Sequence, residues 1–413
     1  MSDQKQKSAG PLSHVRVLDL SRVLAGPWAG QILADLGADV VHVERPGVGD
    51  DTRGWGPPFL KDREGRDTKE SAYYLAVNRG KRSITVDLSK PEGQRLVRRL
   101  AARFDIVLEN YKVGTLAKFG LGYEDLSSVN PKLIYCSVTG FGQDGPRSDQ
   151  AAYDFMIQAM GGLMSVTGER DGAPGGGPQK VGVPIVDLMT GMYTAIAVLA
   201  ALARRDATGE GDYIDIGMLD VQVAMLANQA MNYLVSGKTP KRNGNLHPNI
   251  QPQDVFECRD GTMVLAVGND GQFVKFCAVL GEPELASDER YAKNAARVRN
   301  LDTLRPLIAA KLKQNDRKHW VAALDAAGVP AGPINLIPEV FDDPQVRHRS
   351  MRIDLPHPLS GTVPQVASPM RFKLAPLRHE HAPPLLGEHT LEILREFGID
   401  GAEVEALRAS GAI

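Results

Sequence analysis

The fold is decided by HVRVLDLSRVLAGPWAGQILADLGADVVHVER, residues 14–45. The stretch opens with a short β-rich run (HVRVLDL), continues with helical apolar spacing closed by a glycine (AGPWAGQILADLG), and ends on a second β-rich run (ADVVHVER). Such a succession indicates a strand, a helix and a second strand. Because a helical crossover joins parallel strands, the stretch predicts a βαβ unit.

The same alternation continues along the chain. RSITVDL (residues 82–88) is a strand signal, and PEGQRLVRRLAARF (91–104) is a helix signal with a proline near its start. DIVLEN (105–110) and LIYCSVTGFG (133–142) are two further strand signals. We therefore predict an α/β fold, with a Rossmann-like, mostly parallel sheet in a large domain and a smaller α+β domain. Ligands of such sheets bind where strands end and helices begin.

The second half of the chain changes in character. Residues 151–235 hold long apolar runs, and IVDLMTGMYTAIAVLAALARR (185–205) predicts a buried helix that begins near Asp187. SGKTPKRNGNLHPNIQPQ (236–253) predicts a linker or mobile loop, and DVFECRDGTMVLAVG (254–268) predicts a hairpin that turns at Asp-Gly.

These patterns predict four parts of the chain. Residues 11–225 form the N-terminal part of the large domain, 226–250 a linker and mobile loop, and 251–327 a small domain. Residues 328–413 are rich in Pro and Gly and form an extended return segment that completes the large domain. A segment of this composition has no core of its own, so we expect it to pack over the large domain or across a partner subunit.

The overall charge argues against two classes of partner. The 413 residues include 48 Lys and Arg and 50 Asp and Glu, for a net charge of −2. Without a net positive field or a Lys/Arg run, we expect no binding to nucleic acid or to an anionic membrane. An anionic ligand would depend on local cations instead.

The cysteines and the apolar runs indicate the compartment. Cys136, Cys258 and Cys277 are widely spaced and form no CxxC. Such a set fits a reducing compartment, argues against disulfides or a zinc site, and leaves a nucleophilic cysteine as an alternative. The N-terminus lacks the apolar core of about 7–15 residues of a signal peptide. The longest apolar stretch, residues 194–203, is too short for a membrane span, so we expect a soluble, cytoplasmic protein.

Asp187, in VGVPIVDLMTG (residues 181–191), is the first candidate for chemistry. It follows a short β-rich run and directly precedes the apolar helix. One interpretation is an N-cap, whose side-chain oxygen accepts hydrogen bonds from the first turn of the helix. The other is an anionic nucleophile for acyl transfer, supported by the same helix start. The position of Asp187 alone does not decide between these two interpretations.

Two loops beside predicted strands could hold an anion. Residues 45–56 and 78–83 together carry five cations and one tryptophan: Arg45, Arg53, Arg79, Lys81, Arg82 and Trp55. Arginine binds phosphate, and aromatic or guanidinium planes stack on a base, so the loops predict a platform for a phosphorylated adenine ligand. Ordinary solvated loops are the alternative. The pattern is not GxGxxG, so a dinucleotide site is poorly supported.

RNGNLHP (residues 242–248) is a candidate lid. Gly244 would supply mobility, and the polar neighbours would supply contacts to a reactive intermediate that must be kept from water. The alternative is that His247 has a structural role.

Taken in order, these segments resemble the class III CoA-transferases, the family of formyl-CoA transferase and of the carnitine and bile-acid CoA-transferases. The resemblance rests on six ordered stretches: residues 17–58, YYLAVNRGKRSITVDL (73–88), VGVPIVDLMTG (181–191), ATGEGDYIDIGMLD (207–220), GVPAGPIN (328–335) and APPLLGEHTLEIL (382–394). GDDTRGWGPPF, YYLAVNRGKRSI and ENYKVGTLAKFGLGYEDL look closest to the succinate–hydroxymethylglutarate (glutarate) branch.

The resemblance implies a set of site residues. The nucleophile falls on Asp187. The residues expected to bind CoA are Ala25, Arg45, Trp55, Val86, Asp87, Leu88, Asn110, Lys118 and Thr139. The residues expected around the acid are Arg22, Leu24, Phe141, Tyr153, Gly244, Asn245 and His247. No metal or redox cofactor is implied, because CoA thioesters are the substrates. The N–H groups near Asp187 and the Gly244 loop are expected to stabilise developing oxyanions.

Three departures from formyl-CoA transferase bear on the substrate. That enzyme has His and Gln in its first loop, where this chain has Arg22 and Leu24, and a Tyr where this chain has Phe141. The departures argue against formyl-CoA and oxalate. Arg22 could instead clamp the far carboxylate of a dicarboxylic acid, and an intersubunit salt bridge is the alternative role.

Two other functions remain as alternatives. The related α-methylacyl-CoA racemases need a His before an Asp where this chain has Tyr153 and Asp154, which disfavours racemisation. A non-catalytic CoA-binding subunit is the other alternative. The resemblance also implies an interlocked homodimer, in which each chain is threaded through the other.

Overall fold

The structure is a computed structural model that describes residues 10–377 and 379–413. The chain forms two compact units, and each is described by itself. The first comprises Met1–Leu163, Val181–Ala230 and Pro344–Ile413, and the second comprises Met164–Lys180 and Met231–Asp343.

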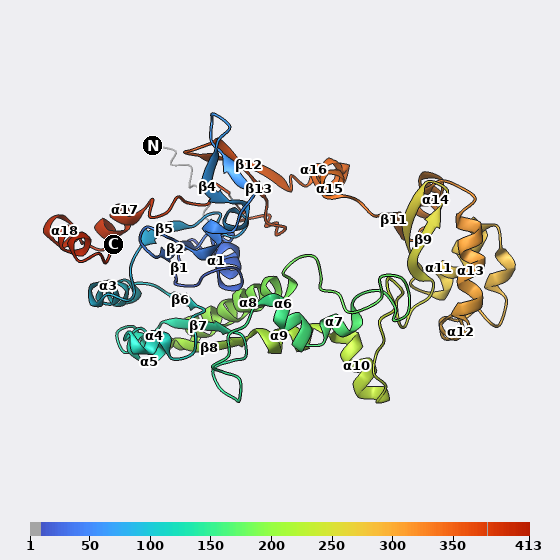
Figure 1. The fold of residues 1–413 in the computed structure, drawn as a ribbon, viewed down its shortest axis with the longest axis horizontal. Helices are drawn as coiled ribbons and strands as arrows, with labels where there is room; N and C mark the ends of the chain where they lie inside the picture. The colour runs from blue at the N-terminus through green and yellow to red at the C-terminus, as the bar shows by residue number, and fades with distance from the viewer. Residues whose placement is uncertain (1–9, 378) are drawn as a thin grey trace. The chain divides into compact units, whose positions relative to one another are not determined.

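A six-stranded parallel sheet forms the centre of the first unit (Figure 1). In sheet order, its strands are β5 (Arg82–Thr85), β2 (Asp39–Glu44), β1 (Arg16–Asp19), β6 (Ile106–Glu109), β7 (Ile134–Thr139) and β8 (Asp212–Gly217). The α/β class and the five strands predicted from apolar runs are confirmed. The prediction missed β8, in which Asp212 and Asp215 interrupt the apolar run.

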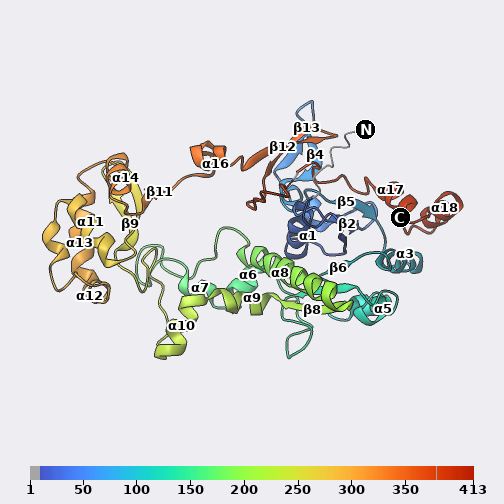
Figure 2. The same ribbon diagram turned by 180° about the vertical axis from the view of Figure 1, so that it is seen from behind.

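Alternate strand residues face two layers of helices, as the period of two along a strand requires. Val17 and Leu108 belong to a core with α1 (Ala25–Asp35) and α8 (Ile185–Thr208), which lie side by side in both views (Figures 1 and 2). Leu18 and Val107 belong to the core of the opposite face. The helices that contribute to that core include α3 (Pro91–Ala101), α17 (Thr390–Glu396) and α18 (Gly401–Ala409). The sheet is therefore buried on both faces, as parallel sheets generally are.

The strand order indicates where a ligand would bind. Numbered by their succession along the chain, the six strands lie in the order 3-2-1-4-5-6, which is that of doubly wound nucleotide-binding sheets. The order reverses between β1 and β6, and ligands of such sheets bind beyond the carboxyl ends of the strands at this point. The topology therefore directs attention to the residues that follow β1 and β6.

Helix α8 corrects the prediction that this region is too short to span a membrane. It runs for 24 residues and has a mean hydropathy of 1.8 over an 18-residue window, so its length and composition alone would permit a span. Yet 44% of that window is buried in the structure, and α8 packs along α1 against the sheet. These contacts are typical of a core helix in a soluble enzyme. The cytoplasmic location stays a prediction.

The remaining elements of the first unit are short. They are η1 (Asp51–Gly54), β3 (Phe59–Lys61), β4 (Asp67–Ser71), α2 (Ala72–Leu75), α4 (Thr115–Lys118), α5 (Tyr123–Ser127), α6 (Asp154–Met160), α9 (Met218–Met225), α16 (Pro344–His348), β12 (Arg352–His357) and β13 (Gly361–Val366). Helices α7 (Leu163–Val166) and α10 (Ala227–Ser236) each have residues in both units.

The carboxyl-terminal segment packs against β5, the edge strand of the sheet (Figure 2). The Gly387 amide donates to Ser83 Oγ at 2.8 Å, and the Asp87 amide donates to the Ala412 carbonyl at 2.8 Å. Apolar residues of α17 and α18 join the core beneath the sheet. Residues 344–413 therefore contribute to the core of the first unit. Residues 328–343, which the prediction placed in the same segment, belong to the second unit, where β11 (Ala331–Pro333) pairs with β10 (Gly261–Ala266).

The second unit has a separate core. It contains the antiparallel sheet β11 (Ala331–Pro333), β10 (Gly261–Ala266) and β9 (Gln253–Cys258), and the helices α11 (Asp270–Leu280), η2 (Pro283–Ala286), α12 (Asn294–Arg299), α13 (Leu301–Leu312), α14 (Arg317–Ala326) and α15 (Ile337–Asp342). The predicted hairpin is confirmed, with Cys258 paired to Gly261 across a tight turn. Residues 237–252 have no helix or strand, whereas residues 227–236, the first part of the predicted linker, form helix α10.

Candidate active site

The loops after β1 and β6 are joined at the point where the strand order reverses. Asn110 Oδ1 accepts a hydrogen bond from the Arg22 amide at 2.8 Å, and Asn110 Nδ2 donates to the Arg22 carbonyl at 2.6 Å. An amide side chain that satisfies both backbone groups of one residue holds that residue in place. The structure thus brings together two predicted site residues, and the side chain of Asn110 holds the backbone of Arg22.

The guanidinium of Arg22 is half-exposed and contacts two groups. Its Nη1 lies 3.3 Å from Asp51 Oδ2, and its carbon lies 5.0 Å from the centre of the Tyr111 ring. Among the described residues, Nη1 is the only guanidinium nitrogen of Arg22 with a hydrogen-bond partner. The other two nitrogens keep donors for a carboxylate. The neighbouring Leu24 and Ala25, at the start of α1, are buried.

Asp50 ties the loop after β1 to the loop after β2. Its carboxylate accepts from the Val23 amide at 3.0 Å and from the Thr52 amide at 2.8 Å, which caps η1. Val23 has a φ of 72°, an uncommon conformation for a β-branched residue that its surroundings must hold. The sequence analysis missed Asp50, whose only signal was its place in a Gly/Asp-rich loop.

Four of the five loop cations have partners within the chain, which corrects the prediction that all five form one phosphate platform. Arg53 pairs with Glu44 and Glu70, Arg79 with Asp35, Lys81 with Asp19, and Arg82 with Asp39 and Glu396. Arg53, Arg79 and Lys81 are also buried. Buried cations require such partners because removing an unpaired charge from water is costly. These residues hold the loops in shape.

Arg45 is the loop cation that remains exposed. It lies beside Asp87, whose pKa is lowered first by hydrogen bonds from Ser89 and then by the charges of Lys90 and Arg45. Val86 and Leu88, on either side of Asp87, are buried. The structure therefore brings Arg45 together with the predicted Val86–Leu88 stretch, at the carboxyl ends of β2 and β5.

Trp55 is connected to Asp187 through Tyr73, which the sequence analysis did not single out. The Trp55 and Tyr73 rings meet edge to face, with centroids 5.1 Å apart, and Trp55 is 41% exposed. Burial raises the pKa of Tyr73 to about 12, and the negative charges of Asp187 and Asp154 contribute. Tyr73 therefore keeps its proton at neutral pH, within electrostatic reach of Asp187.

Asp187 is the third residue of α8 and does not cap it. The N-cap is Pro184, so the N-cap interpretation of Asp187 is wrong. The β-rich run before the helix does not form a strand, because the described residues contain no strand between β7 and α8. Its side chain is half-buried, and burial raises its pKa from 3.8 to about 7, with a further contribution from the negative charge of Asp154. A carboxylate that binds protons this readily is a stronger base than an exposed one.

Asp154, in the first turn of α6, takes the place of a cap for α8. Its Oδ1 accepts from the Val186 amide at 2.8 Å and from the Asp187 amide at 3.4 Å. The Leu188 amide donates to the Pro184 carbonyl. The backbone N–H groups around Asp187 therefore already have partners, which corrects the prediction that they stabilise an oxyanion.

The other predicted residues of the first unit are dispersed. Phe141 packs with Val186 in a small apolar cluster next to Asp187, and Thr139 Oγ1 accepts from the Gly142 amide at 3.0 Å. Lys118 is exposed at the end of α4, and Tyr153 is 65% exposed at the start of α6. None of the hydrogen bonds found among residues 10–377 and 379–413 joins these side chains to Asp187.

The predicted lid residues belong to the second unit. Gly244 has a φ of 62°, and its amide donates to the Gly168 carbonyl at 3.2 Å. His247 Nδ1 accepts from the Asn249 amide at 3.1 Å and from the Ile250 amide at 3.0 Å, which fits the structural role left open for this residue. Asn245 is exposed. The lid stays a prediction.

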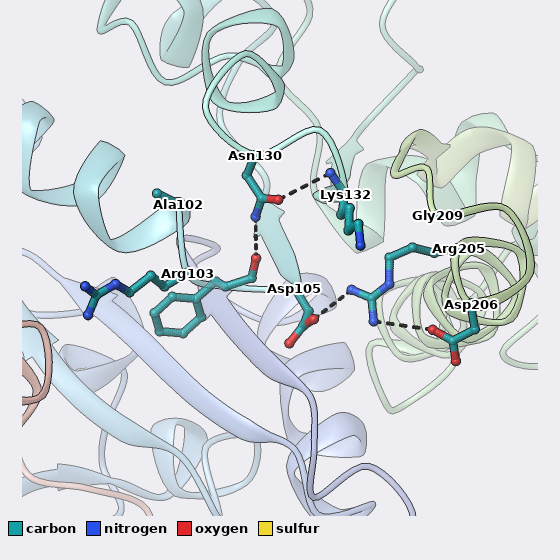
Figure 3. Close-up of a pocket in the computed structure, with 9 residues that line it drawn as sticks. Ala102, Arg103, Asp105, Asn130, Lys132, Arg205, Asp206 and Gly209 are labelled. Atoms are coloured by element: carbon teal, nitrogen blue, oxygen red, sulfur yellow. Dashed lines mark hydrogen bonds and ion pairs between the residues drawn. The ribbon is translucent and has the colours of Figure 1, made fainter.

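A cavity of about 500 Å³ lies at the amino ends of the strands, away from the loops described above (Figure 3). Its charged lining includes Asp105, Arg205 and Asp206, and the Arg205 guanidinium lies 2.7 Å from Asp105 and 3.7 Å from Asp206. The cavity precedes β6 and β7, whereas sheets of this type bind ligands after their strands. It is not the candidate site.

The three cysteines are all buried and unpaired. Burial raises the pKa of the Cys136 thiol strongly and that of Cys277 to about 12, and it also raises the pKa of Cys258. The thiolate is the reactive form of cysteine. The alternative of a nucleophilic cysteine is therefore disfavoured.

Comparison with known proteins identifies the family to which the chain belongs. Residues 12–390 match the family described as "CoA-transferase family III". The chain is 52% identical to a succinate–glutarate CoA-transferase of Agrobacterium fabrum, over 94% of this chain and 96% of that protein. It is 43% identical to a succinyl-CoA:glutarate CoA-transferase of Mus musculus, over 98% of this chain and 91% of that protein.

A solved structure agrees with the fold. The crystal structure of a CAIB/BAIF family protein from Brucella suis superposes with a TM-score of 0.82 at 51% identity. The match covers 94% of this chain and all of that one.

Proposed function

Because the chain belongs to CoA-transferase family III, we propose that it moves CoA between succinyl-CoA, or another dicarboxyl-CoA, and a dicarboxylate such as glutarate, with Asp187 as the nucleophile. The chain is a class III CoA-transferase, so the alternatives of a racemase and of a non-catalytic subunit are set aside. Tyr153, in place of the racemase histidine, agrees with this assignment.

The environment of Asp187 carries the proposal. Burial raises the pKa of its half-buried carboxyl group to about 7, and its charge acts on Tyr73, whose ring meets that of Trp55. A carboxylate of raised basicity, placed beside the loops expected to hold CoA, supports covalent catalysis. Tyr73 keeps its proton and could donate a hydrogen bond to charge that develops during acyl transfer.

The first half-reaction forms an enzyme-bound CoA thioester. An oxygen of Asp187 attacks the thioester carbonyl of the donor, the C–S bond breaks, and CoA leaves as its thiolate. The donor acyl group is then joined to Asp187 as a mixed anhydride. The thiolate then attacks the aspartyl carbonyl of the anhydride, and the donor acid leaves as its carboxylate. Asp187 now carries CoA as a thioester, without the participation of water.

The second half-reaction reverses these steps with a new acid. The acceptor carboxylate attacks the aspartyl thioester, and the CoA thiolate leaves again. The thiolate then attacks the acyl carbonyl of the acceptor in the new anhydride, which forms the product acyl-CoA and restores the Asp187 carboxylate. Each step exchanges one acyl derivative for another, so no external energy source is needed.

Arg22 supports a dicarboxylate as substrate. The relatives named above act on succinate and glutarate, which carry a second carboxylate away from the reacting one. Arg22 follows β1 at the point where the strand order of the sheet reverses. Two of its guanidinium nitrogens make no hydrogen bond to the described residues. A planar guanidinium can bind a carboxylate through two parallel hydrogen bonds.

We also propose that two copies form the interlocked homodimer implied by the resemblance. Helix α10 supports this, because Met231, Tyr233, Leu234 and Val235 are each more than half exposed. An apolar surface of this kind is typical of a protein interface. The Gly244 loop as a lid and the domain boundaries at 225, 250 and 327 remain part of the same proposal.

Mass spectrometry of the intact protein tests the proposed chemistry. After mixing with succinyl-CoA, without an acceptor, the protein is expected to gain the mass of CoA less one water, and peptide mapping is expected to place the adduct on Asp187. Adding glutarate should discharge the adduct and produce glutaryl-CoA. An adduct on a different residue, or an acyl adduct without CoA, would contradict the mechanism.

Arg45→Ala is expected to raise KM for every acyl-CoA roughly 10- to 100-fold, because a charge-assisted hydrogen bond to phosphate contributes about 1.5–3 kcal/mol. KM for the acceptor acid should change much less. Steady-state kinetics with several acyl-CoA donors measures both constants. Arg95→Ala is the matched control, because Arg95 is an exposed arginine that pairs with Glu92 on α3. An unchanged KM for acyl-CoA in Arg45→Ala would show that the CoA platform lies elsewhere.

A further inference from the structure

Asp154 is a buried carboxylate that serves the helix of the nucleophile. It stands in the first turn of α6, yet its Oδ1 accepts hydrogen bonds from the second and third residues of α8, Val186 and Asp187. Pro184, the N-cap of α8, offers no side-chain acceptor for these donors. Because the first N–H groups of a helix need partners from outside the helix, Asp154 supplies what the local sequence lacks.

Gln158 extends the contact by one turn of α6. Its Nε2 donates to Asp154 Oδ2 at 2.6 Å, and its Oε1 accepts from the Val181 amide at 2.9 Å. Gln158 is fully buried. The two side chains, four residues apart on one helix face, therefore hold both ends of the segment that leads from Val181 into Asp187.

The same arrangement leaves the Asp187 carboxylate without stabilising donors. None of the hydrogen bonds found within residues 10–377 and 379–413 reaches its side-chain oxygens. The charged and titratable groups that act on it are Asp154 from α6 and Tyr73 from α2. A second carboxylate nearby disfavours ionisation of the first and makes it a stronger base.

We propose that Asp154 is a positioning residue for the transfer reaction, which fixes the first turn of α8 and places a second carboxylate close to the Asp187 nucleophile. The inference rests on the proposed function, in which Asp187 attacks the thioester. It assigns two separable roles to one side chain. The hydrogen bonds set the direction from which Asp187 meets the substrate, and the charge sets how strongly it attacks.

Substitution by asparagine separates the two roles. Asp154→Asn keeps an oxygen that can accept from the Val186 and Asp187 amides. It removes the negative charge, together with the oxygen that accepts from Gln158 Nε2. With a pKa near 7 for Asp187, kcat/KM of the unmodified enzyme is expected to rise with pH through about 7, because the attacking group must be ionised. In Asp154→Asn this rise should move to lower pH by about one unit, while the maximal kcat falls several-fold and KM stays within about twofold.

Asp154→Ala removes both roles. We expect the same shift of the pH profile and a further loss of kcat of at least about tenfold, because the amides of α8 lose their acceptor. The measurement is the rate of CoA-adduct formation in a single turnover. This rate is divided by the folded fraction from circular dichroism, so that a less stable variant can be compared with the unmodified enzyme. Asp220→Asn is the control, since Asp220 occupies the equivalent first turn of α9 and should leave the profile in place.

The outcomes separate the inference from the proposed function. A folded Asp154→Asn with an unmoved pH profile would overturn the role of the charge. Equal loss of activity and of folded protein in both variants, with no change in profile, would reduce Asp154 to a structural residue and overturn the inference as a whole. In either case the adduct would still form on Asp187 in the unmodified enzyme. Failure of that adduct would contradict the proposed function itself.

Discussion

Asp187→Ala is expected to lower kcat/KM for CoA transfer on the order of 10⁴-fold or more, the scale on which removal of a covalent nucleophile acts. Both half-reactions pass through an aspartyl carbonyl, so no other described group can replace it without a new intermediate. Asp187→Asn should be equally inactive, because a neutral amide does not attack a thioester. The measurements are steady-state transfer from succinyl-CoA to glutarate and the mass of the adduct.

Neither substitution should destabilise the fold. The pKa of Asp187 is raised by burial from 3.8 in the unfolded chain to about 7 in the folded one. Folding therefore favours the protonated form of Asp187. Its contribution to the free energy of unfolding is fully present below about pH 4 and is lost as the pH rises through about 7. At pH 8, Asp187→Asn should thus melt at the same temperature as the unmodified enzyme, or above it.

A matched control lies at the other end of the same helix. Asp206→Asn replaces an exposed aspartate in the last turn of α8 and should leave transfer and melting unchanged. A soluble, folded Asp187→Ala enzyme with near-normal turnover would refute the covalent mechanism.

Arg22→Leu is expected to lower kcat/KM for dicarboxylates roughly 10- to 100-fold more than for monocarboxylates of equal length. A charge-assisted pair with the far carboxylate contributes about 1.5–3 kcal/mol, and only a diacid can form it. The measurement is kcat/KM for matched acids, such as glutarate and valerate. Arg22→Lys should recover part of the preference, because an ammonium lacks the planar fork.

Asp51→Asn tests the alternative role of Arg22 in structure. This variant breaks the ion pair of Arg22 with Asp51 and keeps the guanidinium. If Arg22 binds the substrate, Asp51→Asn should retain the preference for dicarboxylates. If Arg22 acts through its ion pair with Asp51, both Arg22→Leu and Asp51→Asn should lose activity equally for every acid. If Arg22 acts in an intersubunit salt bridge, Arg22→Leu should lose activity equally for every acid, with a change in the mass of the assembly by light scattering. Parallel losses would exclude the clamp.

Much of the fold follows from local pattern. The strands β1, β2, β5, β6 and β7 lie within apolar runs that are too short for helices and that alternate with helical spacing. Strands β1, β6 and β7 are almost wholly buried, and most of their residues are apolar. Strand β5 is mostly polar, and it was predicted from the longer β-rich run RSITVDL. Strand β8 was not predicted, because Asp212 and Asp215 interrupt its run of apolar residues. The helix predicted over residues 185–205 is α8, which the structure extends by three residues to Thr208.

The candidate site was predictable as a set of residues and not as an arrangement. Arg22, Asn110 and Arg45 follow strands, and a parallel sheet places such positions along one edge. The partners of the loop cations could not be deduced, because they come from distant parts of the chain. Arg82, for example, pairs with Glu396. A charge in a loop has the same appearance in the sequence whether it meets a ligand or a buried carboxylate.

The sequence by itself determined the α/β class, the family and the residue most suited to be the nucleophile, because apolar periodicity and ordered motifs are local properties of the chain. Only the tertiary structure decided what surrounds Asp187. Asp154 lies 33 residues before Asp187, yet it accepts the amide hydrogen bonds of α8. Burial raises the pKa of Asp187, and the negative charge of Asp154 contributes. Electrostatic interactions depend on distance in space and on exclusion of water, and both are established only when the helices pack.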